Sequence, residues 1–474
     1  MNIVFILCDQ LRYDALSCNG ATVCKTPNID SIAAEGANMS SFYSANALCS
    51  PARATILTGL YPHMHGQLAN MGNFNNVFDS QVLSRKGYAE YLKEKDFNTG
   101  YAGKWHLPEE GNKDKWKFDQ WYTSKDYHQF LLNQGIDYEM GRDEVAPIEF
   151  GENAPFFGPC TLNADQHEDA WTTEKTCEMM DEFHKTGKDF FVCAAYHGPH
   201  FPYAVPEPYN KMYNPKDVPR YENFSEMFTN KPIVQQMELM RWNTAQLTWP
   251  DWQKVIAAYW GYVSYIDMLV GKILNKIKTL KIEENTAIIF TADHGDMLGS
   301  HRLFNKGFNM YEEDYHIPLL IKWPGISQPG FVSDLYCGLT DLFPTFLQMA
   351  GVEIPEGIHG KSLEEVVNGS EQGNWRDCIM CEFNGYESTL LSIRMIRTKK
   401  WKYIYNPFDR DELYDMESDP GELYNLAPLP AFTHVLRRMR AKLLFILQNV
   451  DDGIVEVTSW QSNSYRLMIS EREK

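Results

Sequence analysis

The chain has 474 residues, of which 63 are acidic and 44 basic, so its formal charge is −19. A protein this acidic is repelled by the phosphate backbone of nucleic acids and by anionic lipid surfaces, so neither is expected as a partner. If it acts on an anionic substrate, it needs a local basic pocket.

The start of the chain reads as a buried strand. It has neither the basic segment nor the small-residue cleavage site of a signal peptide. No stretch approaches the ~18 apolar residues of a membrane-spanning helix. Ten cysteines are scattered along the chain, several of them inside apolar runs, which is typical of buried free thiols in a reducing compartment. The sequence therefore predicts a cytoplasmic protein that does not contact a membrane.

Short apolar runs alternate with longer amphipathic stretches over most of the chain. The runs cover residues 2–8, 99–103, 189–196, 286–292 and 317–322. Residues 252–277 repeat their apolar positions every three or four residues, as a helix does. This alternation predicts an α/β fold in which a large, mostly parallel sheet has helices on both faces. Two polar and aromatic regions, 113–166 and 202–250, are interpreted as insertions that carry binding determinants.

The pattern changes after about residue 369. Short strands are expected at 393–397 and 401–405, with two lysines at the turn between them. A turn at 415–421 and a basic helix at 431–448 follow. We therefore predict two domains, a catalytic α/β domain at 1–370 and a smaller one at 371–474 with an antiparallel sheet and a helix.

Polar side chains follow four of the predicted strands. They are Asp9-Gln10, Lys104-Trp105-His106, the segment from His197 to His200, and Asp293-His294. Because ligands bind outside the carboxyl ends of strands in an open parallel sheet, we expect these groups to converge at one edge. The oxygens of Asp9, Gln10 and Asp293 suit a hard divalent cation, and the imidazole of His294 also tolerates manganese or zinc. Taken singly, each aspartate could equally be the N-cap of a helix.

A second candidate feature is the segment from Leu48 to Gly59. Pro51 predicts a helix that begins near it and ends by Gly59, with Cys49 just ahead of the N-terminus. Such a position binds anions and lowers the pKa of a thiol, and Arg53 lies close enough to face the same point. For an isolated cysteine, a buried structural role would be the better interpretation.

These residues resemble the signature of the type I sulfatases, members of the alkaline phosphatase-like superfamily. The match is Cys49-x-Pro-x-Arg53 followed by four residues and Thr-Gly, and in that family the cysteine is oxidised to formylglycine. Further motifs occur in the family's order at 25–30, 103–107, 197–202, 293–296, 305–307, 412–416 and 419–422. The series spans most of the chain.

The resemblance implies the composition of the active site. A divalent cation, calcium in most members and magnesium or manganese as alternatives, would be held by Asp9, Gln10, Cys49 as formylglycine, Asp293 and His294. Arg53 would help ionise the hydrated aldehyde, whose oxygen attacks sulfur while Lys104 and Lys306 neutralise the sulfuryl oxygens. His200 would protonate the departing alcohol, and His106 would take the proton when sulfate is expelled and the aldehyde reforms.

Gln10 and His294 depart from the residues of many members. They resemble the bacterial branch with choline sulfatase, glycan sulfatases and phosphonate monoester hydrolases. The expected function is hydrolysis of an organic sulfate ester, and a carbohydrate sulfate is preferred over an aryl sulfate or choline sulfate. A phosphonate monoester or phosphodiester hydrolase is the nearest alternative, although Lys104 with His106 favours a sulfatase.

The alternative from another class is a binding protein in which Cys49 stays a thiol. The enzyme reading requires a formylglycine-generating maturation enzyme as a partner. The sequence does not indicate an oligomeric state.

Overall fold

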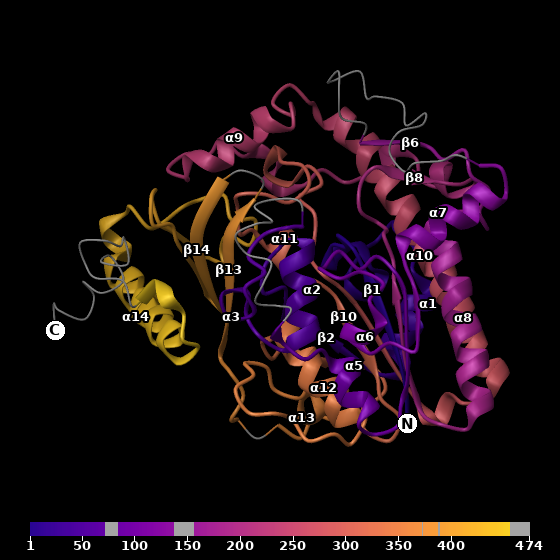
Figure 1. Cartoon of the computed structure of the whole chain (residues 1–474). Coiled ribbons are helices and arrows are strands. Elements are labelled where there is room, and N and C mark those ends of the chain that lie inside the picture. The colour runs from indigo at the N-terminus through magenta and orange to yellow at the C-terminus, as the bar shows by residue number, and fades with distance from the viewer. Residues whose placement is uncertain (72–83, 137–155, 372, 387–388, 456–474) are drawn as a thin grey trace.

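The computed structural model describes residues 1–71, 84–136, 156–371, 373–386 and 389–455, with a large sheet at its centre (Figure 1). Within the described residues this sheet has eight strands. In spatial order they are β11 (Phe331–Ser333), β2 (Ala37–Met39), β10 (Leu319–Lys322), β9 (Thr286–Ala292), β1 (Asn2–Cys8), β7 (Phe190–Ala195), β4 (Asn98–Gly103) and β5 (Gln120–Tyr122).

The central strands run parallel. β1 pairs in parallel with both β7 and β9, and β4 pairs in parallel with β7 and β5. In the described sheet only β10 runs antiparallel to its neighbours, β2 and β9. Every residue of β1 and β9 is buried, because helices cover both faces of a parallel sheet. The predicted mostly parallel α/β sheet is confirmed.

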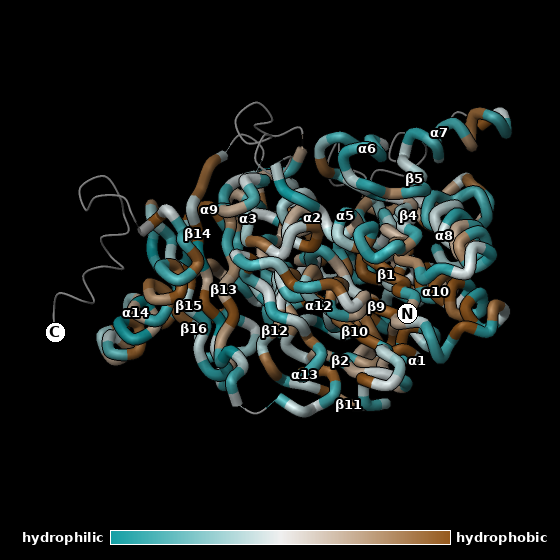
Figure 2. Tube along the Cα trace, turned by 60° about the horizontal axis from the view of Figure 1, so that its bottom comes forward, coloured by the Kyte–Doolittle hydropathy of each residue, from teal (hydrophilic) through white to brown (hydrophobic). Residues whose placement is uncertain are grey.

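Two groups of helices cover the sheet (Figure 1). α1 (Pro27–Glu35), α8 (Glu168–Thr186) and α10 (Trp249–Leu280) pack together on one face, and α2 (Cys49–Thr58), α5 (Tyr88–Lys93) and α12 (Leu342–Met349) pack together on the other. α10 contains the predicted helix 252–277. It starts after a capping box of Thr248 and Asp251 and ends at Lys281, whose φ is 57°. Figure 2 shows apolar residues concentrated along the strands and the inner sides of the helices.

The predicted insertions contain short elements. Those in the described parts of 113–166 are α6 (Lys113–Trp116), β5, α7 (Ser124–Asn133) and β6 (Phe157–Pro159). Those in 202–250 include β8 (Tyr203–Val205), which pairs with β6, and α9 (Ile233–Arg241). β5 is an edge strand of the main sheet, so this part of 113–166 is not an insertion. Three residues are too few for a strand pattern to stand out in the sequence.

The remaining short elements connect these layers. They are β3 (Phe42–Tyr43), α3 (Pro62–His65), α11 (Glu312–Tyr315), β12 (Cys337–Gly338) and α13 (Glu364–Val367).

The C-terminal part forms a separate antiparallel sheet. Its strands are β13 (Cys378–Tyr386), β14 (Thr389–Thr398), β15 (Trp401–Tyr405) and β16 (Glu412–Asp415), and α14 (Thr433–Asn449) packs against it (Figure 1). The predicted hairpin turn at Lys399 and Lys400 joins β14 to β15. The small α+β unit is thus confirmed, whereas a domain boundary near residue 370 stays a prediction.

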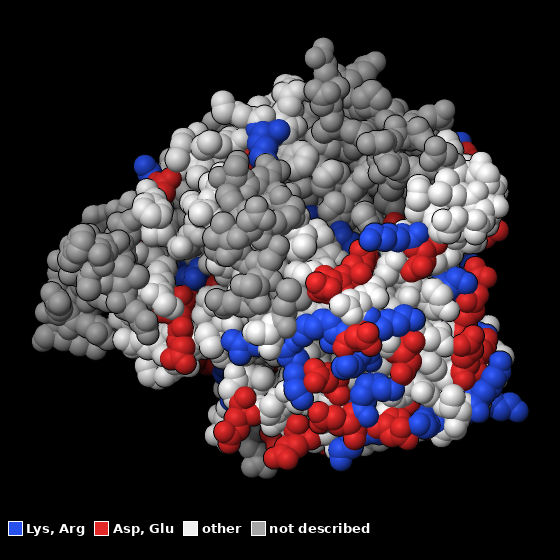
Figure 3. Space-filling model, in the orientation of Figure 1, with Lys and Arg blue, Asp and Glu red and all other residues white. Residues whose placement is uncertain are grey.

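The distribution of surface charge, the state of the cysteines and the character of the helices complete the description of the fold. On the face in Figure 3, positive and negative side chains are interspersed where the surface is described. All ten cysteines are free. None of the helices in the described ranges combines the length and the apolar character needed to cross a membrane.

Candidate active site

The carboxyl ends of β1 and β9 bring two acidic residues together. The backbone N–H of Asp293 donates to the carbonyl of Cys8, and that of Gln10 donates to Asp293 Oδ1 at 3.1 Å. The chain turns sharply at Gln10, whose φ is 66°. Asp9, Asp293 and His294 are fully buried. Two strands far apart in sequence thereby place two carboxylates and one imidazole at the same sheet edge.

Cys49 is the first residue of α2, with Leu48 as N-cap. The sequence predicted a start near Pro51, two residues later. The earlier start is possible because the first-turn N–H groups have no partner within a helix, so Pro51 loses no bond there. Gly59 ends the helix with a φ of 69°.

The thiol of Cys49 lies among the polar groups of the strand ends. Its Sγ is 3.2 Å from His294 Nε2, 3.6 Å from Asp9 Oδ1 and 3.9 Å from Lys104 Nζ. The side chain is only 1% exposed. Burial and Asp9 raise the pKa of the thiol, but Lys104, Lys306 and His294 outweigh them and bring it well below its usual value.

Four residues could hold a cation. One donor atom each from Asp9, Cys49, Asp293 and His294 lies within 4.8 Å of the others. Burial and the Asp9 carboxylate raise the pKa of Asp293 to about 7, although His294 and Arg53 act in the opposite direction, so further positive charge would favour the ionised form. A divalent cation supplies that charge, and two carboxylates with an imidazole are ligands that such ions accept. The donor set therefore fits the expected metal.

Arg53 joins the two carboxylates. Its Nε donates to Asp293 Oδ2 and its Nη2 to Asp9 Oδ2, both at 3.0 Å, while Nη1 donates to the carbonyl of Lys104 at 2.6 Å. Lys104 Nζ lies 2.7 Å from Asp9 Oδ2. Burial raises the pKa of Asp9, but Lys104 and its cationic neighbours outweigh burial, so it lies well below its usual range. Asp9 therefore stays ionised.

Gln10, Lys306 and His200 form a chain beside this cluster. Lys306 Nζ donates to Gln10 Oε1 and lies at the same distance, 2.9 Å, from His200 Nε2. His200 Nδ1 is 2.6 Å from the carbonyl of Phe201, which fixes its proton on Nδ1. Burial, Lys306 and Lys104 lower the pKa of His200 to about 4. His200 is thus a neutral imidazole whose Nε2 accepts a hydrogen bond from the ammonium of Lys306.

The backbone of His106 contacts the first turn of α2. Its carbonyl accepts a hydrogen bond from Ser50 Oγ at 2.7 Å, so its backbone lies beside the helix start. Among the described residues, the buried Nδ1 of its side chain has no hydrogen-bond partner. A role for His106 as a base stays a prediction.

Two acidic residues that the sequence analysis assigned no role support the site. Asp296 accepts hydrogen bonds from Gln10 Nε2 at 2.6 Å and from the Tyr203 hydroxyl. Asp169, at the start of α8, accepts from the backbone N–H of His197 at 2.7 Å and from the Tyr262 hydroxyl at 2.9 Å. Asp296 stands in the motif 293–296 and could have been found there, but nothing in the sequence around Asp169 points to His197.

Comparisons with known proteins identify the family of the chain. A family model described as sulfatase matches residues 1–352, and one described as N-sulphoglucosamine sulphohydrolase, C-terminal, matches residues 299–449. An uncharacterized sulfatase of Escherichia coli is 28% identical over 472 residues, 95% of this chain and 88% of that protein. An N-acetylglucosamine-6-O-sulfatase of Bacteroides thetaiotaomicron is 27% identical over 477 residues, 90% of this chain and 82% of that protein.

A solved structure shares the fold. The phosphonate monoester hydrolase of Agrobacterium radiobacter superimposes with a TM-score of 0.79 at 24% identity, covering 95% of this chain and 96% of that one.

Proposed function

The chain belongs to the sulfatase family and is a sulfuric ester hydrolase, and we propose that it acts on a carbohydrate sulfate through a formylglycine made from Cys49. The observation that carries the proposal is the position of Cys49. It is the first residue of α2, buried, and within 4 Å of His294, Asp9 and Lys104. A thiol lacks the second hydroxyl that a hydrated aldehyde offers, so we infer that the modified residue is the nucleophile.

The metal in this proposal is calcium. Asp9, Asp293, His294 and residue 49 would hold it, with Gln10 as a further oxygen ligand. A bound divalent cation supplies positive charge that polarises a sulfuryl oxygen.

The chain's own residues account for the steps of hydrolysis. Arg53 favours ionisation of one hydroxyl of the hydrated aldehyde, which loses its proton to water. The oxygen then bonds to sulfur as the bond from sulfur to the alcohol oxygen breaks. Lys104, which pairs with Asp9, and Lys306, which bonds to Gln10, stabilise the charge on the sulfuryl oxygens. The alcohol takes a proton from the hydrogen-bonded pair of Lys306 and His200. The second hydroxyl then gives up its proton, to His106 in our proposal, sulfate leaves and the aldehyde reforms.

A carbohydrate substrate is supported by two observations. The relative from Bacteroides thetaiotaomicron is named for a sulfated sugar. In this chain, Phe201 stacks on His200 at 4.8 Å between ring centroids, and Trp242 lies 5.4 Å from Phe201. Aromatic rings beside the group that protonates the alcohol offer an apolar face to a sugar ring.

The proposal has two cellular requirements. The chain must meet a maturation enzyme that oxidises Cys49. We also propose a cytoplasmic location, because ten free cysteines suit a reducing compartment.

The function is tested with protein co-expressed with a formylglycine-generating enzyme. Sulfate release is measured on sulfated amino sugars and uronates, choline sulfate and an aryl sulfate. Phenol release is measured on that aryl sulfate and on a phosphodiester of the same phenol. We expect the highest kcat/KM for a sulfated sugar. A phosphodiester value well above all sulfate values would instead favour a phosphonate or phosphodiester hydrolase, as in the structural neighbour.

A further inference from the structure

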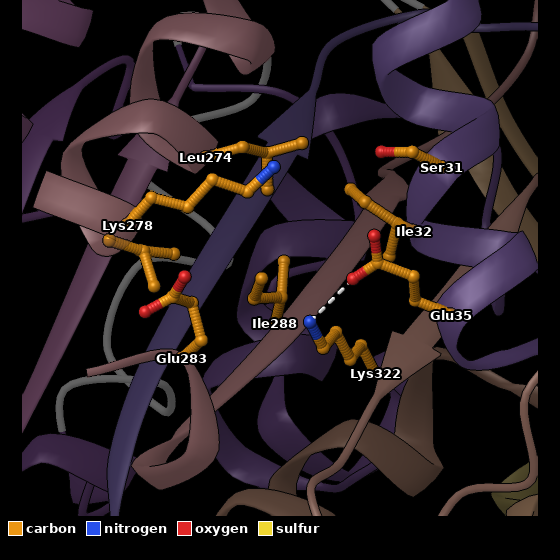
Figure 4. A pocket seen from close by; sticks show the side chains of 9 residues that line it. Ser31, Ile32, Glu35, Leu274, Lys278, Glu283, Ile288 and Lys322 are labelled. Atoms are coloured by element: carbon orange, nitrogen blue, oxygen red, sulfur yellow. Dashed lines mark hydrogen bonds and ion pairs between the residues drawn. The ribbon is translucent and has the colours of Figure 1, made fainter. Parts of the chain in front are cut away.

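A cavity of about 610 Å³ lies between α14, the start of β13 and the loop that carries His359 and Lys361. Small-molecule sites usually measure roughly 300 to 1,000 Å³, so this cavity has the size of one. The hollow beside the ion pair of Glu35 and Lys322 (Figure 4) measures only about 30 Å³, roughly enough for one water molecule. Of these two cavities, only the larger one can hold an organic ligand.

The cavity is far from the reacting residue. It is lined by Tyr61, which follows the C-terminal end of α2, whereas Cys49 is the first residue of that helix. The ten residues of α2 separate the two ends by about 15 Å. A ligand in this cavity therefore occupies a site distinct from the candidate active site.

Most of the lining is apolar. Tyr61, Ile379 and Met380 form buried parts of the wall. Phe445 on α14 also lines the cavity and is 64% exposed, so part of the apolar lining is accessible from solvent. These side chains favour a ligand with a flat or compact apolar body.

The polar lining includes the amide of Asn449, the carboxylate of Asp377 and the donors Lys361 and His359. Lys361 has no carboxylate within ion-pair distance in the described part of the chain, and its Nζ lies 5.6 Å from the centre of the Trp375 ring. Arg376 and Lys442 are each already paired, with Asp341 and Asp377. One cation is therefore left for a ligand.

His359 adds a neutral donor. Its Nδ1 accepts a hydrogen bond from the backbone N–H of Tyr61 at 3.1 Å, so the proton of the neutral ring is on Nε2. Burial and His63 lower the pKa of His359 to about 4, which keeps the ring neutral near pH 7. A negatively charged group thus meets a full positive charge and an N–H donor, in a protein whose overall charge is −19.

We propose that this cavity binds a small amphipathic anion, an aromatic or alicyclic body that carries a single carboxylate, sulfonate or sulfate group. The apolar body lies against Phe445 and Met380, and the anionic group faces Lys361. This inference does not depend on the proposed function, because no lining residue takes part in the hydrolysis.

The probe for the test is anilinonaphthalene sulfonate, titrated by fluorescence and calorimetry into the full chain with excess inorganic sulfate present to occupy the active site. We expect one binding site, and Lys361→Gln and Phe445→Ser should each weaken its affinity about tenfold. The matched controls are Lys399→Gln and Phe408→Ser, which change side chains that are also strongly exposed but lie outside the cavity. The controls should bind the probe as the unchanged protein does.

The proposal is overturned if both cavity variants bind like the unchanged protein, if the controls weaken binding equally, or if inorganic sulfate or Cys49→Ala abolishes it. Thermal melting confirms that each variant is folded. Lys361→Gln alters an exposed side chain and keeps the test decisive should Phe445→Ser fail to fold.

Discussion

At the scale of single residues, the site depends on one arginine that two strand ends share. Arg53 bonds to Asp9, to Asp293 and to the carbonyl that precedes Trp105, and it is only 3% exposed. A lysine carries its three donors on one nitrogen and cannot span the separate acceptors that Nε, Nη1 and Nη2 of Arg53 reach. Arg53 therefore fixes the spacing of the two candidate metal ligands.

The substitution Arg53→Lys should lower kcat/KM by about a hundredfold and the free energy of unfolding by about 3 kcal/mol. Sulfate-release kinetics and urea unfolding measure these effects. The matched control is Arg376→Lys, since Arg376 also makes a two-bond contact with a buried aspartate, Asp341, but lies away from Cys49. Equal losses of activity in the two variants would mean that Arg53 acts only on stability.

The sequence predicts the residues of the site better than their partners. Asp9 and Asp293 are predictable, because residues that follow parallel strands must meet at one sheet edge. The contact of Lys306 with His200 and that of Asp169 with His197 are not predictable, because loops and helices remote in sequence create them. His106 follows β4 as predicted, and the role of its side chain stays a prediction.

At the scale of elements, the C-terminal sheet is hydrogen-bonded to the chain on both sides of the helix that carries Cys49. The backbone N–H of Glu382 in β13 donates to the carbonyl of Ala45 at 2.8 Å, four residues before Cys49. Its carboxylate accepts from the backbone N–H of His63, which follows α2, at 3.2 Å. A residue of the small sheet thus fixes the position of α2, the helix that carries Cys49.

Glu382→Gln should lower kcat about tenfold with little change in KM, because a small shift of α2 misplaces the nucleophile without removing substrate contacts. Steady-state kinetics with the matured enzyme measure both parameters. Hydrogen exchange of the α2 amides in unmatured protein should also accelerate, independently of activity.

The control for Glu382 is Asp411→Asn. Asp411 is another buried acid of this sheet, bonded to Arg440, but none of its described contacts reach residues 45–65. A similar loss of kcat in this control would show that general loosening of the sheet explains the effect.

His63 predicts a pH dependence of stability. Its Nδ1 lies 3.1 Å from Glu382 Oε1, and its Nε2 lies 2.9 Å from the carbonyl of Val450. Both nitrogens can donate hydrogen bonds to these acceptors only when the ring is charged. Burial lowers the pKa of His63, but Glu382 and Asp452 outweigh burial and raise it above 6.5. A group whose pKa is higher in the folded protein than in the unfolded chain stabilises the fold. Its contribution is complete at pH values below the unfolded pKa and is lost as pH rises through the folded pKa.

The free-energy difference between the unchanged protein and His63→Gln should therefore be larger at about pH 6 than at about pH 9. Urea unfolding at both pH values measures it. His65→Gln is the control with the opposite trend, because burial lowers the pKa of His65 to about 3 and its neutral ring is favoured as pH rises past 6.5. A constant difference for His63 would mean that its ring is not charged in the folded protein.

Elements were predictable where they are long and apolar. The strands β1 and β9 match the predicted ranges because complete burial leaves an unbroken apolar run. β5 was missed because three residues at a sheet edge carry little pattern, and α2 starts two residues early because proline is tolerated throughout a first turn.

At the scale of the whole molecule, the net charge of −19 contrasts with the site. Arg53, Lys104 and Lys306 lie around Asp9 and Asp293, so the basic side chains outnumber these carboxylates. An anionic substrate is thus met by local positive charge, which a bound cation increases. From the composition we could infer only that an anionic substrate needs a basic pocket. The fold locates these basic side chains at the carboxyl ends of β1 and β9.

Removal of the metal should destabilise the whole protein. Without a cation the buried carboxylates of Asp9 and Asp293 repel one another, and Tm should fall by about 5 °C in a calcium chelator and recover on addition of Ca²⁺. Scanning calorimetry measures this without any substrate. In the variant Asp293→Asn, the chelator should have little effect on Tm. If the Tm of the unchanged protein does not respond to the chelator either, the metal assignment is contradicted.

The central claim is that the formylglycine at position 49 performs the hydrolysis. The most direct measurement prepares the chain with graded amounts of maturation enzyme. It compares the aldehyde fraction at residue 49, from mass spectrometry of the peptide 46–53, with the rate of sulfate release from the best sulfated sugar. The account predicts a straight line through the origin. Sulfate release that is independent of the aldehyde fraction, or absent when residue 49 is fully converted, would contradict it.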